Sequence, residues 1–430
     1  MKDSLGDTLG RARLPARAAF VGILLLATLS SFHLDADSAR VAARIARALD
    51  PQVGARDAID ALRNLALFAG WGVVWMATAT GRTARQLALA ILTGAAISLG
   101  VETAQLFSAV RNASLLDLFT NTLGTVIGAF GFVALVRLAA ARRDRRSFVG
   151  IPALAIAGAY GLACFIEATV PLFRQEEIYG AGGGPFARLG EALASFSWRS
   201  LLNLPVEDLF LFLPAGIFAV AALVEGGRSY RDARNQAVVY GTVLAVLAEL
   251  LHGPNGQPIV AGAALVHALA VVAGALLGAR FLPAFSKAVR GAARPRAVLR
   301  LLGVLLALWA LRPWVPEWMP FSERLSPDWW IPLAALGGRM DLFSVADVVG
   351  PFCLYFSLGA LLAVWPWRRR GWMANLWPAV WLAFGTEALQ LFVQDRFVDM
   401  TDPLIQVSGA VIGWIIIRRA GYRPYGETHP

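Results

Sequence analysis

The chain contains a succession of apolar segments, each close to the length that crosses a lipid bilayer. A spanning helix needs about 20 mostly apolar residues. Twelve segments fit this description, near residues 14–32, 59–80, 85–107, 117–140, 149–169, 205–224, 236–252, 259–282, 297–312, 344–366, 373–393 and 403–420. We therefore predict an all-α fold, a polytopic transmembrane helix bundle of about 12 helices.

Composition argues against a soluble protein. Of 430 residues, 57% are hydrophobic and only 16% are charged, whereas soluble domains carry about 25% charged residues. One soluble core stops growing beyond about 250–300 residues and cannot hide this much apolar side chain. The two cysteines, Cys164 and Cys353, lie inside apolar segments. Neither a disulfide framework nor a cysteine metal site is predicted.

Arginine residues are concentrated in alternate connections between the apolar segments. The net charge of +10 would suggest a nucleic-acid partner in a soluble protein. In a membrane protein the same excess follows the positive-inside rule, so no nucleic-acid partner is predicted. The rule places both termini in the cytoplasm. The connection 40–63 is an exception, because it carries five arginines on the side expected to face outward.

A polar pattern recurs after a shift of 285 positions. Its first copy is Glu102, Gln105, Phe107, Arg111, Ser114, Asp117, Asn121, Gly124 and Gly128. Its second copy is Glu387, Gln390, Phe392, Arg396, Asp399, Asp402, Gln406, Gly409 and Gly413. Every spacing is kept, and the positions that differ are polar in both copies.

A fainter third copy lies between these two. It comprises Asp208, Phe212, Gly216, Glu249, His252, His267 and Gly274. Gln257 and Ala263 stand at its Arg and Asp positions. We therefore predict three four-helix units, 1–146, 147–290 and 291–430, with the full polar set in the outer two and a degenerate middle unit.

The repeated polar residues are the candidate functional residues. About nine residues connect the two helices that carry them, so these helices should form an antiparallel hairpin with its polar groups near the extracytoplasmic surface. The main ligand-binding candidates are Glu102, Gln105, Arg111, Asp117, Asn121, Glu387, Gln390, Arg396, Asp402 and Gln406. The secondary candidates are Asp60, Asn64, Asp347, Glu249, His252 and His267.

Each candidate also has an architectural interpretation. Ionisable groups at membrane depth are costly and often functional, but Glu102 and Arg111 can also form an ion pair that neutralises both. Ser114 and Asp117 have the spacing of a helix-start capping box. Glycine pairs four residues apart are typical of helix packing. For the charged candidates, the sequence leaves function and architecture equally open.

The sequence offers no clear catalytic or metal site. Glu249, His252 and His267 carry metal-ligand side chains, but fifteen residues separate the histidines and no HExxH pattern occurs. Polar packing is the favoured interpretation, and neither a metal nor a cofactor is predicted. No nucleophile elbow, P-loop or dinucleotide fingerprint occurs, so the question of enzymatic activity stays open.

The polar pattern resembles the VanZ-like family, named for a membrane protein associated with teicoplanin resistance. Residues 57–140 match the family's pattern, and residues 341–419 match it nearly as well, departing at Pro351 and Gln406. The resemblance implies a multi-pass protein of the bacterial cytoplasmic (inner) membrane, belonging to the cell envelope. It implies no particular reaction.

Three functional hypotheses follow. The first is an envelope protein with an outward-facing polar pocket that binds or modifies a lipid-linked, glycan or glycopeptide ligand, with arginine as the partner of an anionic group. The second is a secondary transporter, although three units with polar groups near one surface differ from the usual paired repeats around a midplane site. The third is a non-catalytic membrane scaffold or regulator. Beyond the bilayer itself, the sequence identifies no partner or oligomeric state.

Overall fold

The computed structural model describes most of the chain and shows helices throughout the described part. The described residues are 5–29, 33–49, 55–109, 113–143, 152–169, 185–202, 204, 208–252, 259–290, 342–365, 372–390 and 400–422. Within them, the only β contact is an isolated antiparallel bridge between Leu34 and Ser108. The described residues form two compact units, the first ending at Arg137 and the second beginning at Leu138.

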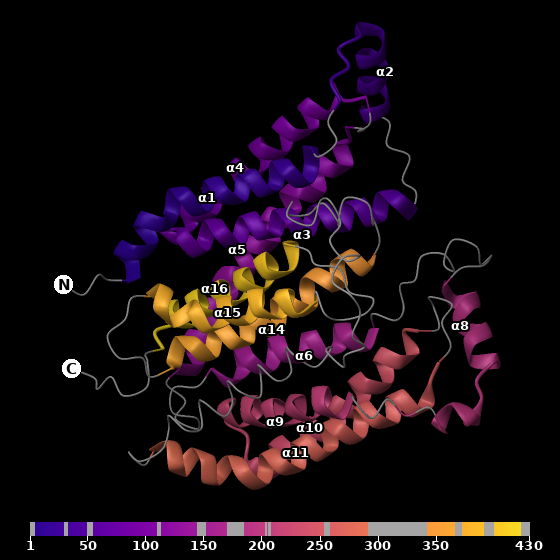
Figure 1. Ribbon diagram of the computed structural model, residues 1–430, viewed down its shortest axis with the longest axis vertical. Helices are drawn as coiled ribbons and strands as arrows, with labels where there is room; N and C mark the ends of the chain where they lie inside the picture. Colours follow the sequence, from indigo (N-terminus) through magenta and orange to yellow (C-terminus); the bar gives the residue numbers. More distant parts are fainter. Residues whose placement is uncertain are drawn as a thin grey trace. The chain divides into compact units, whose positions relative to one another are not determined.

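The first unit is built from long helices and one short one (Figure 1). Its elements are α1 (Leu5–Leu29), α2 (Ser38–Leu49), α3 (Ala55–Thr78), α4 (Thr83–Gln105) and most of α5 (Leu115–Arg143). Helix α1 packs against α3 and α4. Its Arg17 donates to the Trp75 carbonyl oxygen and the Thr78 hydroxyl of α3, which ties the two helices together at one end.

The second unit contains the remaining described helices. They are α6 (Ala153–Thr169), α8 (Pro185–Ala194), the 3-10 helix η2 (Trp198–Leu202), α9 (Leu209–Glu225), α10 (Tyr230–Leu250), α11 (Ala261–Arg290), α14 (Leu342–Val364), α15 (Trp372–Gln390) and α16 (Thr401–Arg419). Helix α9 packs against α10 and α11, and α14 packs against α15 and α16. Helix α6 contacts both α9 and α14 (Figure 1). Its buried Tyr160 donates a hydrogen bond of 2.9 Å to the Leu211 carbonyl oxygen.

Local sequence explains why α9 ends and α10 begins where they do. Gly227 has a φ of 92°, a left-handed conformation that glycine adopts without a Cβ penalty. Ser229 then accepts a hydrogen bond from the Asp232 backbone N–H, as an N-cap serine does. The two helices therefore reverse direction through a short connection.

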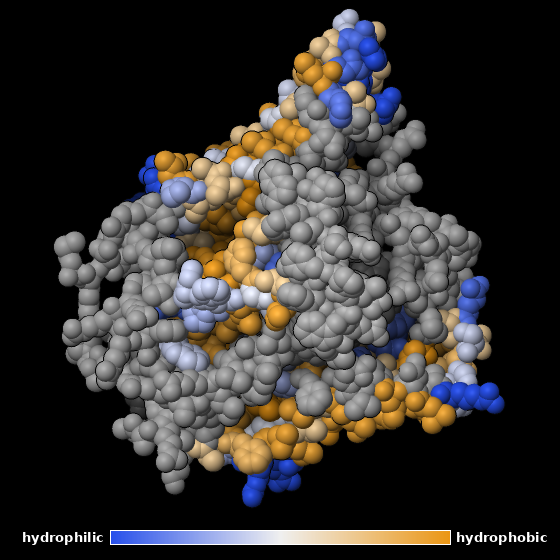
Figure 2. Space-filling model, viewed as in Figure 1, coloured by the Kyte–Doolittle hydropathy of each residue, from blue (hydrophilic) through white to orange (hydrophobic). Residues whose placement is uncertain are grey.

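Three described helices are long and apolar enough to cross a membrane: Thr83–Gln105, Leu115–Ala141 and Ala261–Ala284. Shorter apolar helices occur at Asn64–Thr78, Ala153–Phe165, Leu211–Glu225 and Val348–Val364. Their surfaces carry exposed large apolar side chains, seen as orange areas in Figure 2. Water-soluble monomers seldom expose such contiguous apolar surface, so the helices are those of a membrane protein.

Helices lie at all the predicted apolar segments except 297–312, which is outside the described residues. The all-helical fold is thus confirmed for the described part of the chain, whereas the number of spans stays a prediction. Helices α2 and α8 and the short η2 were not predicted, because they are too short for a spanning segment. The domain boundaries 1–146, 147–290 and 291–430 also stay predictions.

Close helix packing at glycine recurs in three helix pairs. A Cβ atom on Gly128 of α5 would collide with the Ala69 carbonyl oxygen of α3. A Cβ on Gly274 of α11 would collide with the Leu213 carbonyl of α9, and one on Gly413 of α16 with the Phe356 carbonyl of α14. Only glycine allows backbones to approach this closely. The glycines are therefore packing residues, as their spacing predicts.

Candidate functional site

The carboxylate of Glu102 joins the two helices of the first predicted hairpin. Glu102 lies in the last turn of α4 and is buried. Its Oε2 accepts a hydrogen bond of 2.9 Å from the Ser114 backbone N–H, immediately before α5. The first N–H groups of a helix have no partner inside the helix, so a carboxylate there satisfies one of them. Glu102 therefore caps α5 from the neighbouring helix.

The middle of the chain repeats this contact. Glu249 lies in the last turn of α10, and its Oε1 accepts a hydrogen bond of 2.6 Å from the Val260 N–H, immediately before α11. The same Oε1 lies 3.4 Å from the His252 Nδ1. The positions of Glu249 and Val260 are those that the repeat assigns to Glu102 and Ser114. In both hairpins, therefore, the glutamate at the end of one helix caps the start of the next helix.

A second polar contact joins α3 to α5 in the first unit, and another joins the start of α9 to α11 in the second unit. In the first unit, the Asn64 Nδ2 of α3 donates to the Asp117 Oδ1 of α5 at 2.8 Å. In the second unit, the His267 Nε2 of α11 lies 2.9 Å from the Asp208 Oδ2 beside α9. His267 also stacks on the Phe212 ring, with centroids 4.0 Å apart. The two pairs are not equivalent by position, because the repeat aligns His267 with Asn121 and Ala263 with Asp117.

Asn121 lies two turns into α5 and is almost fully buried, at 1% exposed. Its Nδ2 donates a hydrogen bond of 2.9 Å to the Ser98 Oγ of α4. Its Oδ1 is buried and has no hydrogen-bond partner among the described residues. A buried acceptor without a partner is costly, so this oxygen calls for an explanation.

The positions equivalent to Asn121 share this property. His267 is 4% exposed, and its Nδ1 is buried without a partner among the described residues. The Gln406 Oε1 of α16 is likewise buried and without a partner in the described part of the chain. Three different polar side chains at one repeated position each keep a buried polar atom unsatisfied. Nothing in the sequence indicates this shared property.

Gln105 has a partner outside the hairpin. Its Nε2 donates a hydrogen bond of 3.2 Å to the Thr28 carbonyl oxygen of α1. Gln105 therefore ties α4 to α1, and the structure brings Asn64, Glu102, Asp117 and Asn121 together between α3, α4 and α5.

The remaining candidates are only partly described. Glu387 is buried in the last turn of α15, and Asp402 lies in the first turn of α16. Arg111 and Arg396 lie outside the described residues. The side chains of Asp60, Asp347 and Gln390 lie in helices but are not described. The predicted Glu102–Arg111 and Glu387–Arg396 pairs therefore stay predictions.

The capping interpretation of Ser114 is correct in a modified form. The Ser114 hydroxyl accepts a hydrogen bond of 3.1 Å from the Leu116 N–H. The N–H of Ser114 donates to Glu102, so the carboxylate of the cap comes from α4. In a capping box within one helix, the acid three residues further on, here Asp117, would fill that role.

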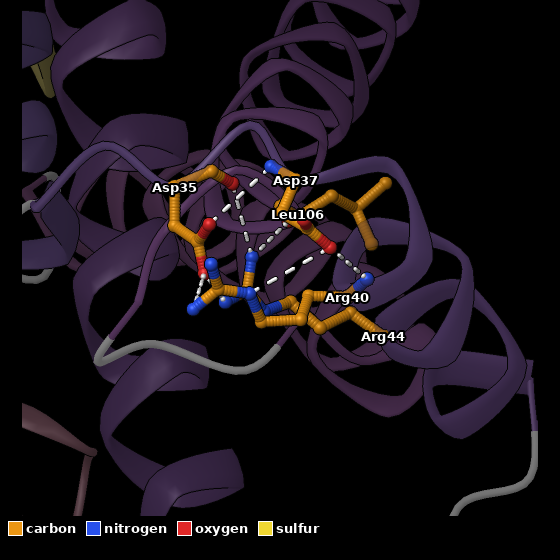
Figure 3. Close-up of polar contacts among 5 residues, drawn as sticks. All are labelled: Asp35, Asp37, Arg40, Arg44 and Leu106. Atoms are coloured by element: carbon orange, nitrogen blue, oxygen red, sulfur yellow. Dashed lines mark hydrogen bonds and ion pairs between the residues drawn. The ribbon is translucent and has the colours of Figure 1, made fainter.

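A clamp of polar contacts joins the start of α2 to the end of α4 (Figure 3). The Arg44 guanidinium donates to the Asp35 carboxylate at 2.6 Å and to the Leu106 carbonyl oxygen at 3.1 Å. Asp37 begins α2 as its N-cap, accepting from the Arg40 N–H at 3.0 Å. The Arg44 hydrogen bond lowers the pKa of Asp35 from its ordinary value of 3.8.

Sequence reasoning missed two buried polar groups. Glu225 ends the apolar α9 and is 2% exposed. Its carboxylate accepts from the Leu154 N–H of α6 at 2.7 Å and from the Tyr422 hydroxyl at 3.2 Å. A lone acid after an apolar segment was the available signal for Glu225. Ser98, the partner of Asn121, is one hydroxyl in an apolar helix and gives no signal.

The described residues contain no group of three or more His, Cys, Asp or Glu side chains arranged to hold a metal ion. The Glu249 Oε1 lies 3.4 Å from the His252 Nδ1 and accepts from the Val260 N–H, and the Asp208 Oδ2 lies 2.9 Å from the His267 Nε2.

One family model matches more than half of the chain. The model of the VanZ/LLP1 family matches residues 19–138 and again residues 269–421. The chain belongs to the VanZ/LLP1 family. No curated protein and no solved structure gives a significant match.

The two matched ranges divide the VanZ/LLP1 chain unevenly. The first range covers the C-terminal part of α1 and all of α2, α3 and α4, and it ends within α5. The second begins within α11 and ends just after α16. Residues 139–268, most of the predicted middle unit, lie outside both ranges. Two matches to one family are consistent with tandem VanZ-like units.

Proposed function

We propose that this VanZ/LLP1-family protein is a multi-pass protein of the bacterial inner membrane that binds a polar ligand of the cell envelope. The ligand is lipid-linked, glycan or glycopeptide in character. It is bound near the extracytoplasmic ends of the helix pairs that carry Asn121, His267 and Gln406. The three-unit organisation of the chain is part of this proposal.

The observation that carries the proposal is the recurring buried polar atom at these three positions. The atoms are the Asn121 Oδ1, the His267 Nδ1 and the Gln406 Oε1, none with a partner among the described residues. An unsatisfied buried polar group costs about 1–3 kcal/mol. Three repeated costs at one position are difficult to explain by packing alone. A ligand that supplies hydrogen-bonding groups would offset them.

The position of Asn121 supports a ligand that reaches into the membrane. Asn121 lies six residues beyond the start of α5 at Leu115, about 9 Å along the helix axis at about 1.5 Å per residue. It lies within the apolar stretch Leu115–Ala141 that is long enough to span a bilayer. Polar groups at this depth usually face protein or a solvated space. A lipid-linked polar group is suited to that depth.

A second candidate function, a non-catalytic scaffold or regulator, also has a specific observation in its favour. Glu102 is bonded to the Ser114 backbone, and Asn64 is bonded to Asp117. Residues that hydrogen-bond one another across helices hold a bundle together without any ligand. The two functions differ at Asn121, because a scaffold does not require its unsatisfied oxygen.

The test replaces the polar pair between α4 and α5 by apolar groups. Asn121→Leu combined with Ser98→Ala removes both hydrogen-bonding partners, which can be neutral for stability. Alanine already stands at the positions equivalent to Ser98, Ala245 and Ala383. The purified full-length protein would be mixed with a polyprenyl phosphate, a muropeptide or teicoplanin. Thermal stabilisation by each probe would be measured.

We expect at least one probe to stabilise the wild-type protein and to lose this effect in the double variant, with the unfolding temperature without probe preserved. The matched control is Thr93→Ala, which removes a hydroxyl bonded to the Leu89 carbonyl and to Trp71 on the same helix as Ser98. The control should keep the probe response. An undiminished response in the double variant would contradict the proposal and favour the scaffold.

A further inference from the structure

Helix α2 is short and amphipathic, and it carries arginine but no acidic residue. Its 12 residues, Ser38–Leu49, cover about 18 Å at about 1.5 Å per residue, too little to cross a bilayer. Arg40, Arg44 and Arg47 recur at positions i, i+4 and i+7 and share one face. The exposed surface over α2 is mostly blue in Figure 2, with a smaller orange area beside it. A helix of this kind is typical of membrane surfaces.

The structure fixes the level of α2 relative to a spanning helix. The Arg44 Nη1 donates to the Leu106 carbonyl oxygen at 3.1 Å, one residue beyond the end of α4 at Gln105. The preceding segment is held to the same place, because the Asp35 N–H donates to the Phe107 carbonyl oxygen at 2.8 Å. Since α4 is long enough to cross the bilayer, α2 lies where the bilayer ends.

The same clamp fixes how α2 is rotated about its axis. Val41, Arg44 and Ala48 are partly covered and form the stripe that faces the rest of the protein. The Ile45 side chain stands to one side of this stripe and is 43% exposed. Arg40 stands on the other side, with 67% of its side chain exposed and its guanidinium 3.4 Å from the Asp35 Oδ2 and 3.7 Å from the Asp37 Oδ1. Apolar and basic side chains therefore lie on opposite flanks of an anchored helix.

We infer that α2 lies in the headgroup layer of the leaflet where α4 ends and recognises anionic phospholipid. Ile45 inserts toward the acyl chains. Arg40 and Arg47 contact the lipid phosphates, as guanidinium groups with long apolar stems do at an interface. The inference does not depend on the ligand proposed for Asn121.

The experiment places an environment-sensitive fluorophore on α2 in the full-length protein. Ile45→Cys carries the probe on the proposed membrane flank, and Ala43→Cys carries it on the opposite side of the same helix. The protein is reconstituted into nanodiscs of phosphatidylcholine, with or without phosphatidylglycerol. Wild-type protein, whose Cys164 and Cys353 are buried, measures background labelling.

We expect the Ile45 probe to emit at shorter wavelength than the Ala43 probe and to be quenched by lipid-attached quenchers. Phosphatidylglycerol should strengthen the quenching at Ile45. Arg40→Gln with Arg47→Gln should abolish that increase, and the corresponding double lysine variant should keep it. Arg82→Gln with Arg85→Gln removes two exposed charges from another connection and should leave the increase unchanged.

Two results would overturn the inference. One is indistinguishable emission and quenching of the Ile45 and Ala43 probes, since α2 would then lie away from the bilayer. The other is an Ile45 response to soluble polyphosphate with none to phosphatidylglycerol. In that case the arginines would recognise a polyanion in solution.

Discussion

The hairpin α4–α5 and the hairpin α10–α11 share a framework but differ in the polar groups that it encloses. In both, a buried glutamate at the end of one helix accepts from the backbone N–H that begins the next. In both, a glycine of the later helix packs against a carbonyl of an earlier one. Asn121 and Ser98 in the first hairpin, however, correspond to His267 and Ala245 in the second.

The repeated sequence pattern contains two kinds of polar residue, and this difference distinguishes them. Contacts between a side chain and backbone are repeated with the same residue type, because the backbone groups at helix ends always need partners. The enclosed position keeps a polar atom unsatisfied but changes its residue type. We interpret the glutamates and glycines as framework, and positions 121, 267 and 406 as functional.

The largest expected effect is the loss of a framework glycine. Gly128→Ala places a Cβ against the Ala69 carbonyl oxygen, and Gly274→Ala does the same at Leu213. Overpacking of this kind costs about 1–3 kcal/mol. Both variants should lower membrane abundance and unfold more easily in detergent. Thermal unfolding followed by circular dichroism measures the loss.

Gly131→Ala is the matched control on α5, because nothing lies within 4 Å of its added Cβ. Alanine is favoured over glycine by about 0.5–1 kcal/mol inside a helix, so this variant should be neutral or slightly stabilising. Equal losses for Gly128→Ala and Gly131→Ala would show that the close approach is not what stabilises the hairpin.

A smaller effect is expected from the framework glutamates. Glu102→Ala and Glu249→Ala each leave a backbone N–H at a helix start without its partner, at a cost of about 0.5–2 kcal/mol, the range for loss of a side chain that caps a helix start. Glutamine retains a carbonyl oxygen and should recover part of the loss. The unfolding temperatures of the four variants provide the measurement. The comparison breaks if Glu249→Ala destabilises the protein and Glu102→Ala does not.

The smallest effect is expected from the Asp35–Arg44 contact, which lies beside the end of α4 in the first hairpin. Arg44 stabilises the carboxylate in the folded protein, so the folded pKa of Asp35 lies below the ordinary value of 3.8. The contact therefore contributes fully above that value and is lost as pH falls through the folded pKa. Asp35→Asn should slightly lower the unfolding temperature at neutral pH, and this deficit should shrink below about pH 4. A deficit that is the same at all pH values would contradict the assignment.

Much of this fold was predictable from the sequence, because apolar length and polar repetition leave clear patterns. The segments 85–107 and 117–140 appear as α4 and α5 within a few residues. Helix α2 was missed because it is short and rich in arginine, so it has neither spanning length nor high hydropathy. Its start is decided by Asp37, whose capping role depends on local backbone geometry.

The candidate site was predicted less completely than the fold. The sequence brings Glu102, Asp117 and Asn121 to one hairpin, and the structure agrees. It does not reveal that the Glu102 partner is a backbone N–H, because backbone groups have no residue signature. Nor does it reveal the unsatisfied atoms at positions 121, 267 and 406, which depend on the packing of neighbouring helices.

The most direct test of the division into framework and functional positions is made in living cells. Asn121→Leu combined with Ser98→Ala, and Gln406→Leu, would be compared with Glu102→Ala and Glu249→Ala in a strain lacking the wild-type gene. Membrane abundance and susceptibility to glycopeptides and envelope stress would be measured for each. We predict normal abundance with lost protection for the leucine variants, and lost abundance for the glutamate variants. Protection that simply follows abundance in all four variants would contradict a functional role for the enclosed position.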